Sequence, residues 1–310
     1  MAGIAGVVVA PEWRGRGVAR LLMTSAMQRA LELGDVVSVL FPAVAAPYRR
    51  LGWELAGSVT RTTIAAEPLR ALAAPAVALR RATAADVDAI LALTSRHGSA
   101  SRASGPLDLS RDDVYELVSD PDNFCYLAPD GFLLYAWDGK ELRVERLISE
   151  SAETTRALWA LVGSGASVVR SVYTYLPTHD PIHWFLDASA GPDVRVEPWM
   201  LRLLDARQAI SGRGYPAGTT ADVPITLSDD WLVGCTGSFR LRVGSGSGEL
   251  VPADDSPGSL RLGPNGLAAL YAGTPMYTLR GAGLATGGTP EHDELLDAVF
   301  AARPYLIDSF

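Results

Sequence analysis

The stretch VAPEWRGRGVARLLM, residues 9–23, contains residue types that bind an anion. Arg14 and Arg16 supply planar guanidinium groups, which form paired hydrogen bonds with phosphate oxygens. Gly15 and Gly17 let the backbone approach a ligand closely. A helical pattern begins at Gly17, and the unpaired amides at the start of a helix attract negative charge. These residues predict a binding site for a phosphate or pyrophosphate group.

The spacing of the glycines excludes two common nucleotide-binding loops. A dinucleotide-binding fingerprint requires G-x-G-x-x-G, but Arg20 occupies the place of the third glycine. A P-loop requires Gly-Lys-Ser/Thr, which the sequence lacks. An exposed basic turn is the alternative to a ligand site. We favour the ligand site because the glycines lie between a predicted strand and a predicted helix.

The elements around these glycines are a strand, a helix and a second strand. The β-branched runs Ile4–Val9 and Val36–Phe41 predict two strands buried on both faces. Between them, apolar residues recur every three or four positions, and Gly34 is a suitable helix end. This order predicts a βαβ unit with two parallel strands.

At these positions the sequence resembles the GCN5-related N-acetyltransferases, the GNAT family. RGRGVA, Arg14–Ala19, matches the R/Q-x-x-G-x-G/A loop with which that family binds the pyrophosphate of acetyl-CoA, here with alanine in the last place. The resemblance also implies that the strand before the loop contacts the pantetheine arm. It thereby assigns acetyl-CoA binding to Val7, Val8, Val9, Arg14, Gly15, Arg16, Gly17, Val18 and Ala19.

Downstream, YRRLGW, Tyr48–Trp53, resembles the family's Y-x-x-x-G-F/W segment. The resemblance implies that Tyr48 faces the sulfur of CoA. A phenol with a pKa of about 10 can donate a proton to a departing thiolate. The alternative for Tyr48 is a packing residue on a short helical turn that Gly52 ends.

The order of the units along the chain resembles the enhanced intracellular survival (Eis) family of acetyltransferases. The resemblance implies a mixed α+β and α/β fold: a partial acetyl-CoA-binding GNAT domain over residues 1–75, a second, degenerate GNAT-like domain over 76–199, and a sterol-carrier-protein-like (SCP2-like) α/β domain over 200–310. The loop position of the second domain, Ile148–Trp159, has no R-x-x-G, so we expect it to bind no CoA.

The resemblance also implies a role for the chain terminus. In the Eis family the terminal carboxylate enters the active site as general base, which here is the α-carboxylate of Phe310. The segment AARPYLIDSF is apolar enough to dock, although chain ends usually fray. A carboxylate with a pKa of about 3.5 is a weak base toward an ammonium unless it is desolvated or acts through water.

Only Met1–Gly3 precede the first predicted strand, whereas in the family several elements that line the acceptor pocket come earlier. We favour the interpretation that the sequence begins at an internal methionine; the alternatives are a natural fragment and a wrong family assignment. We expect a chain extended upstream to be more soluble and more active, because a parallel strand without neighbours exposes an apolar edge.

Local patterns give further expectations. Thr83, Ser110 and Ser151 are predicted helix N-caps, and Gly244–Gly248 is predicted to be a hairpin turn rather than a phosphate cradle. Three tryptophans are expected in the core, and two acidic pairs are expected in exposed loops. These residues are Trp184, Trp199, Trp231, Asp229-Asp230 and Asp254-Asp255.

Composition narrows the class of protein. The net charge of −8 argues against a nucleic-acid partner and mildly favours a cationic small molecule. No apolar stretch can span a bilayer, so we expect a cytoplasmic protein in which Cys125 and Cys235 are reduced and buried. We predict no metal site, because His179 and His183 lack a third ligand.

The sequence therefore predicts an N-acetyltransferase. It would move an acetyl group from acetyl-CoA to a primary amine of a cationic small molecule or a lysine, by direct attack without an acyl-enzyme. The alternative is a protein that binds an apolar ligand or assembles subunits, with an inactive, incomplete acetyltransferase part. The family's oligomers imply a homo-oligomer.

Overall fold

The computed structural model describes residues 1–72, 76–101, 105, 109–177, 179–187, 193–302 and 304–306. The chain divides into two compact units. The first consists mainly of Met1–Ser58 and Pro198–Pro304, and the second mainly of Val59–Glu197. The first unit contains both ends of the chain, so this division does not follow the predicted order of three domains. The predicted domain boundaries near residues 75 and 200 therefore stay predictions.

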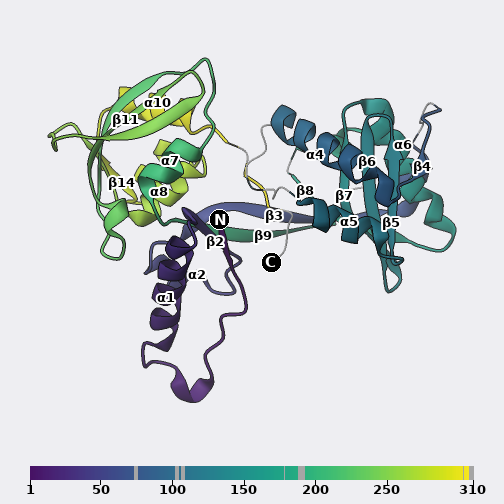
Figure 1. The fold of residues 1–310 in the computed structure, drawn as a ribbon, viewed down its shortest axis with the longest axis horizontal. Helices are drawn as coiled ribbons and strands as arrows, with labels where there is room; N and C mark the ends of the chain where they lie inside the picture. The colour runs from purple at the N-terminus through teal and green to yellow at the C-terminus, as the bar shows by residue number, and fades with distance from the viewer. Residues whose placement is uncertain are drawn as a thin grey trace. The chain divides into compact units, whose positions relative to one another are not determined.

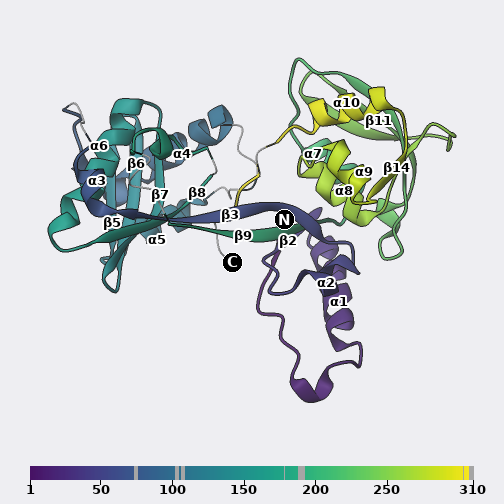
Figure 2. The same cartoon turned by 180° about the vertical axis from the view of Figure 1, so that it is seen from behind.

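The βαβ unit predicted at the start of the chain is present in the first unit. Strand β1 (Ala2–Ile4) is followed by helix α1 (Val18–Glu32) and strand β2 (Val37–Leu40). The strands are parallel, with Ile4 opposite Leu40. Figure 2 shows the long connection that leaves β1 and turns back into α1.

The first strand is shorter than expected, so the prediction of a strand over Ile4–Val9 was wrong. β1 ends at Ile4, the residue opposite the last residue of β2. Gly6 has a φ of +67°, which takes the chain out of the extended conformation. A strand persists only where its amide and carbonyl groups have partners, and here the register with β2 ends.

The remaining elements of this region close a small core. Helix α2 (Ala45–Arg49) leads into strand β3 (Glu54–Ala65), and β2 pairs antiparallel with β9 (Asp193–Leu203). Both β3 and β9 have residues in each unit. The buried side chains of the core come from α1, β2, the turn after α2, and β9 with the residue that follows it: Met23, Met27, Ala30, Leu40, Leu51, Trp53, Met200 and Leu204.

The C-terminal part of the first unit is a five-stranded sheet in the order β12-β11-β10-β13-β14, with helices packed against it (Figure 1). Alternate residues of β10 are buried, which gives the sheet one apolar face. The strands are β10 (Ala221–Leu227), β11 (Gly237–Gly244), β12 (Ser247–Pro252), β13 (Leu260–Leu262) and β14 (Ala285–Gly287). The helices are α7 (Ala206–Gly212), α8 (Pro264–Tyr271), α9 (Met276–Gly281) and α10 (Pro290–Val299).

The second unit contains a mixed sheet with the order β3-β8-β7-β6-β5-β4. β7 and β8 are parallel and α6 connects them, so this unit repeats the strand-helix-strand order of the first. The strands are β4 (Arg80–Arg81), β5 (Asn123–Ala128), β6 (Gly131–Asp138), β7 (Glu141–Ser149) and β8 (Ser171–Leu176). The helices are α3 (Ala66–Arg70), α4 (Val87–Ser101), α5 (Arg111–Ser119) and α6 (Ala152–Gly163).

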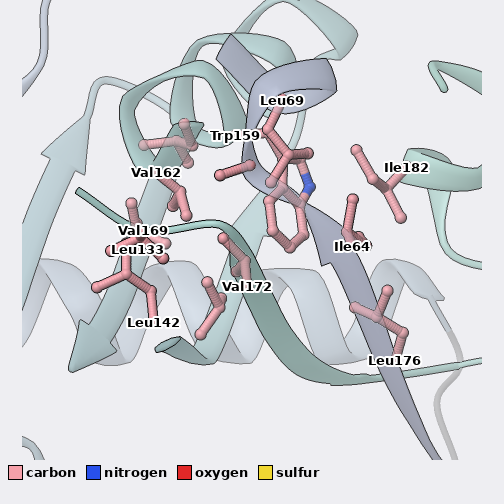
Figure 3. Close-up of a cluster of buried hydrophobic side chains, with 13 residues drawn as sticks. Ile64, Leu69, Leu133, Leu142, Trp159, Val162, Val169, Val172, Leu176 and Ile182 are labelled. Carbon is pink, nitrogen blue, oxygen red and sulfur yellow. The ribbon is translucent and has the colours of Figure 1, made fainter. Parts of the chain in front are cut away.

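The core of the second unit lies between α3, α6 and the sheet. Figure 3 shows Trp159 among Leu69, Ile64 and Val172, all of them buried. The helices approach closely because α6 has a glycine at the contact. A Cβ atom on Gly163 would lie 2.2 Å from the backbone nitrogen of Arg70.

Most local predictions were confirmed. Ser110 and Ser151 accept hydrogen bonds from amides of their helices, and Thr83 forms a capping box with Asp86. Gly244 pairs with Ser247 across the predicted hairpin turn. The described residues include no helix that is both long enough and apolar enough to span a bilayer.

The prediction for the tryptophans was partly wrong. Trp199 is buried, but Trp184 is 69% exposed and Trp231 is 40% exposed. Both exposed residues lie in loops or short turns rather than on the apolar face of a regular element. Cys125 and Cys235 are buried free thiols, as expected.

Candidate active site

The loop before α1 is shaped by short-range hydrogen bonds and two glycines. The amide of Trp13 donates to Ala10 O at 2.9 Å, and Arg14 Nε donates to Val9 O at 3.1 Å. Gly15 and Gly17 have φ values of +74° and +79°, in the left-handed region that favours glycine. Gly17 is the N-cap of α1. The predicted loop, with its helix start, is therefore present.

Among the described residues, the backbone amides from Gly15 to Arg20 have no hydrogen-bond partner within the protein. After Arg14, the next amide with a hydrogen-bond partner in the described part of the chain is that of Leu21, which donates to Gly17 O at 3.0 Å. The amides from Gly15 to Arg20 thus remain available at the positive end of the α1 dipole. Such a row of donors suits the oxygens of a phosphate group.

The arginines of the loop lie at the surface. The guanidinium of Arg16 lies 5.2 Å from the centre of the Trp13 ring, a cation–π distance. Arg14 uses only Nε within the loop, so its two terminal nitrogens can bind an external acceptor. The loop combines amide donors with exposed positive charge.

The valines expected to contact the pantetheine arm lie outside β1. Val7 packs against the core of the first unit, whereas Val8 is 79% exposed. The correction follows from the short register of β1 described above. Their assignment to acetyl-CoA binding remains a prediction.

Tyr48 lies near the end of α2 and is half-buried against the core that contains Met27 and Trp53. Its carbonyl oxygen accepts hydrogen bonds from Leu51 N at 2.9 Å and Trp53 N at 3.2 Å. The predicted helical turn is therefore folded back on the backbone of Tyr48, and Gly52, with a φ of +91°, ends it.

The helix start at the corresponding place of the second unit is arranged differently. The amide of Thr154 donates to Ser151 Oγ at 3.2 Å, so the first turn of α6 is capped by the protein itself. The hydroxyl of Thr154 also donates to the Asp130 carboxylate, which places negative charge there. Such an end is unsuited to a second anion, in contrast with that of α1.

The sequence analysis missed several residues that contact the turn after Tyr48, residues 49–53. Arg202 and Asp229 form a buried ion pair beside Gly52, and Asn265 bonds the carbonyls of the turn. The prediction of an exposed acidic loop was therefore wrong for Asp229. The available signal was an arginine inside the apolar run WMLRLL, because a buried charge requires a partner.

Two further predictions concern the general base and a metal site. Phe310, the expected general base, lies outside the described residues. Within those residues, no group of three or more His, Cys, Asp or Glu side chains is placed to hold a metal ion.

The parallel strand-helix-strand unit carries a glycine loop whose amides remain open, an arrangement suited to a phosphorylated ligand. Family models described as an acetyltransferase (GNAT) domain match residues 1–56 and residues 108–203. A model described as a sterol carrier protein domain matches residues 206–307. The chain belongs to the GCN5-related N-acetyltransferase family.

Known relatives agree with this assignment. The chain is 47% identical to a GCN5-related N-acetyltransferase from Kribbella flavida, with a TM-score of 0.94 over 99% of this chain and 79% of that one. It is 28% identical to N-acetyltransferase Eis of Mycobacterium tuberculosis, over 89% of this chain and 74% of the relative. Eis1 of Mycobacterium abscessus has the same fold, with 24% identity, a TM-score of 0.72, and coverage of 99% of this chain and 82% of that one.

These findings confirm the predicted family, the relation to Eis and the mixed α/β fold with GNAT-like and SCP2-like parts. They support acetyl transfer in general terms.

Proposed function

We propose that the chain transfers the acetyl group of acetyl-CoA to a primary amine of a cationic small molecule or of a lysine side chain. The observation that carries this proposal is the run of open amides from Gly15 to Arg20 at the start of α1. In a GNAT protein such a loop is suited to the CoA pyrophosphate. The net charge of −8 favours a cationic acceptor over an anionic one.

The reaction requires no covalent enzyme intermediate. The amine nitrogen attacks the thioester carbonyl carbon, the carbon–sulfur bond breaks, and the sulfur leaves with the electron pair. Tyr48 would donate a proton to this thiolate, and the α-carboxylate of Phe310 would accept the proton that the amine loses. The products are an amide and CoA thiol; Phe310 then releases its proton to solvent, and Tyr48 takes one up from solvent.

The position of Tyr48 supports its role as proton donor. Its side chain is half-buried against the core that contains Met27 and Trp53, and its carbonyl oxygen accepts two hydrogen bonds within the turn. A positioned general acid typically contributes a factor of about 10² to 10⁴ in rate. We also propose that the protein is a cytoplasmic homo-oligomer. Light scattering after gel filtration would measure the mass of the assembly and so test the oligomeric state.

The test measures thiol release from acetyl-CoA with a panel of amines, beside calorimetric titration of acetyl-CoA. We expect Tyr48→Phe to lower kcat by about 100-fold while acetyl-CoA still binds. Tyr277→Phe is the matched control, because that tyrosine is 89% exposed on α9. Removal of Phe310 should lower kcat for amines with high pKa values most strongly.

Two results would contradict the proposal. The absence of heat on titration with acetyl-CoA would show that the α1 loop does not hold the coenzyme. Full activity of Tyr48→Phe would remove that residue from the proton transfer.

A further inference from the structure

The turn that follows Tyr48 is bonded by a side chain from a distant part of the sequence. Nδ2 of Asn265 lies 3.0 Å from Arg49 O and 3.0 Å from Trp53 O. It also lies 3.5 Å from Glu54 Oε2. Asn265 is in the first turn of α8, within the region that matches the sterol carrier protein domain. One amide group thus joins the two ends of the turn.

These bonds add a side-chain donor to two carbonyls, that of Arg49 at the end of α2, which also accepts from Gly52 N at 3.0 Å, and that of Trp53 beyond the helix. A helix leaves its last carbonyls without intrahelical partners, and α2 has only five residues. The NH₂ group of an asparagine has two hydrogens, so it can serve two carbonyls together. Asn265 therefore acts as a C-terminal cap supplied from elsewhere in the chain.

The same turn rests on a closely packed layer. A Cβ atom on Gly52 would lie 2.7 Å from Pro264 Cβ and 2.8 Å from Arg202 Cζ. Arg202 is fully buried and is held by Asp229. Because the glycine has no side chain, the turn can lie directly on α8 and on β9.

A third contact closes the turn. Arg49 Nε donates to Glu54 Oε1 at 2.8 Å, and the same oxygen accepts from Leu55 N at 2.9 Å. Glu54 is itself buried. The position of the turn is therefore defined at both ends and underneath.

We propose that Asn265 is a positioning residue for acetyl transfer, which it supports by holding the turn that carries Tyr48. The proposal rests on the function proposed above. The amide of Trp53 donates to Tyr48 O, so a shift of Trp53 shifts the backbone of Tyr48. A misplacement of about 1 Å can lower a rate by about 10². The SCP2-like region thereby contributes to catalytic geometry.

The first test asks whether the side chain holds the turn, and it needs no activity. Hydrogen–deuterium exchange is measured over residues 45–55 in the full chain, for Asn265→Ala and Asn265→Asp. Aspartate has the shape of asparagine but no N–H donor when ionised, and it would repel the carbonyls and Glu54. We expect faster exchange in this segment for both variants. Unchanged exchange in both would overturn the proposal.

Asn123→Ala is the matched control, since Asn123 is the other asparagine of the sequence. Its Nδ2 donates to Leu117 O at 3.0 Å in the second unit, far along the chain from Tyr48. We expect this variant to leave exchange over residues 45–55 and kcat unchanged. The control therefore shows whether an effect comes from loss of the Asn265 bonds or from loss of any asparagine side-chain hydrogen bond.

The second test asks whether the turn positions Tyr48. We expect Asn265→Ala to lower kcat by about 10-fold or more, with the KM for acetyl-CoA unchanged, because the α1 loop is not touched. In a Tyr48→Phe background the same substitution should cost little more, since both act through one proton transfer. Independent, multiplying losses would overturn the proposal, as would faster exchange with an unchanged kcat.

Failure of the proposed function has a different signature. In that case the unaltered chain releases no thiol with any amine, and acetyl-CoA gives no heat. The exchange measurement still decides whether Asn265 holds the turn. Hydrogen–deuterium exchange therefore reports the contact of Asn265 with the turn, whereas thiol release and calorimetry report the proposed activity.

Discussion

Arg202 and Asp229 form an ion pair whose side chains are both fully excluded from solvent, with 2.5 Å between Nη2 and Oδ2. The other carboxylate oxygen of Asp229 accepts from Trp231 N and Leu232 N. Two nitrogens of Arg202, Nε and Nη1, have no hydrogen-bond partner among the described residues. The Asp229 carboxylate is thus the main partner of the buried Arg202 guanidinium, which packs against Gly52.

We expect Asp229→Asn to destabilise the first unit by about 3–5 kcal/mol, because it leaves a buried guanidinium without its counter-charge. Urea denaturation measures the change in the free energy of unfolding. The control is Asp255→Asn, which breaks the pair with Arg261, whose two side chains are about half exposed. That pair should contribute little, because solvent screens two exposed charges. Equal effects of the two substitutions would contradict the prediction.

A second prediction concerns the glycine at the start of α1. Gly17→Ala introduces a side chain where φ is +79°, which distorts the row of amides that we propose binds pyrophosphate. We expect the affinity for acetyl-CoA to fall by about 10-fold or more, as measured by calorimetry.

Gly34→Ala is the matched control for that substitution. Gly34 follows the other end of α1, has a φ of +84°, and has open space at its Cβ position, whereas a Cβ on Gly17 would lie 3.7 Å from Arg20 Nη2, an ordinary contact. Both alanines should cost about 1 kcal/mol of stability, because both require a left-handed conformation. Acetyl-CoA affinity should fall only for Gly17→Ala, and an equal fall in both would point to a general loss of folding.

A third prediction concerns the two thiols. Burial raises the pKa of Cys125 to about 11 and that of Cys235 to about 12. Because the thiolate is the reactive form, neither should react with an aromatic disulfide reagent at pH 8 in the folded protein. Both should react once the chain is unfolded in urea. Rapid labelling of the folded protein would show that one thiol is accessible and ionised.

Features that depend on neighbouring residues were predictable from the sequence. The caps Thr83 and Ser110 and the hairpin turn at Gly244–Gly248 were all confirmed, because each is determined by a few adjacent residues. The parallel pairing of β1 with β2 was also confirmed, since one helix between two neighbouring strands brings the second strand back in the same direction.

Features that depend on distant residues were not predictable in this way. The length of β1 depends on where its register with β2 ends, which Ile4–Val9 alone does not reveal. The burial of Asp229 depends on Arg202, and the cap on Arg49 comes from Asn265. A single sequence states that a buried charge or an open carbonyl needs a partner. It does not state which residue supplies it.

The capping box at the start of the α4 region should make stability depend on pH. Asp86 accepts from Arg80 Nη2 at 2.6 Å and from Thr83 N at 2.8 Å, and these bonds hold its pKa well below the usual range, Arg80 contributing most. A lowered carboxyl pKa stabilises the fold above the unfolded value of about 3.9, and this contribution is lost as the pH falls toward the folded value. We expect Asp86→Asn to cost about 1 kcal/mol at pH 7 and progressively less below pH 4, measured by urea denaturation.

Asp113→Asn, in the equivalent box of α5, removes a carboxylate whose lowered pKa comes from Ser110 alone, so its effect should be smaller. A difference for Asp86→Asn that stays constant down to the most acidic pH would contradict this account, because it would not depend on the carboxylate charge.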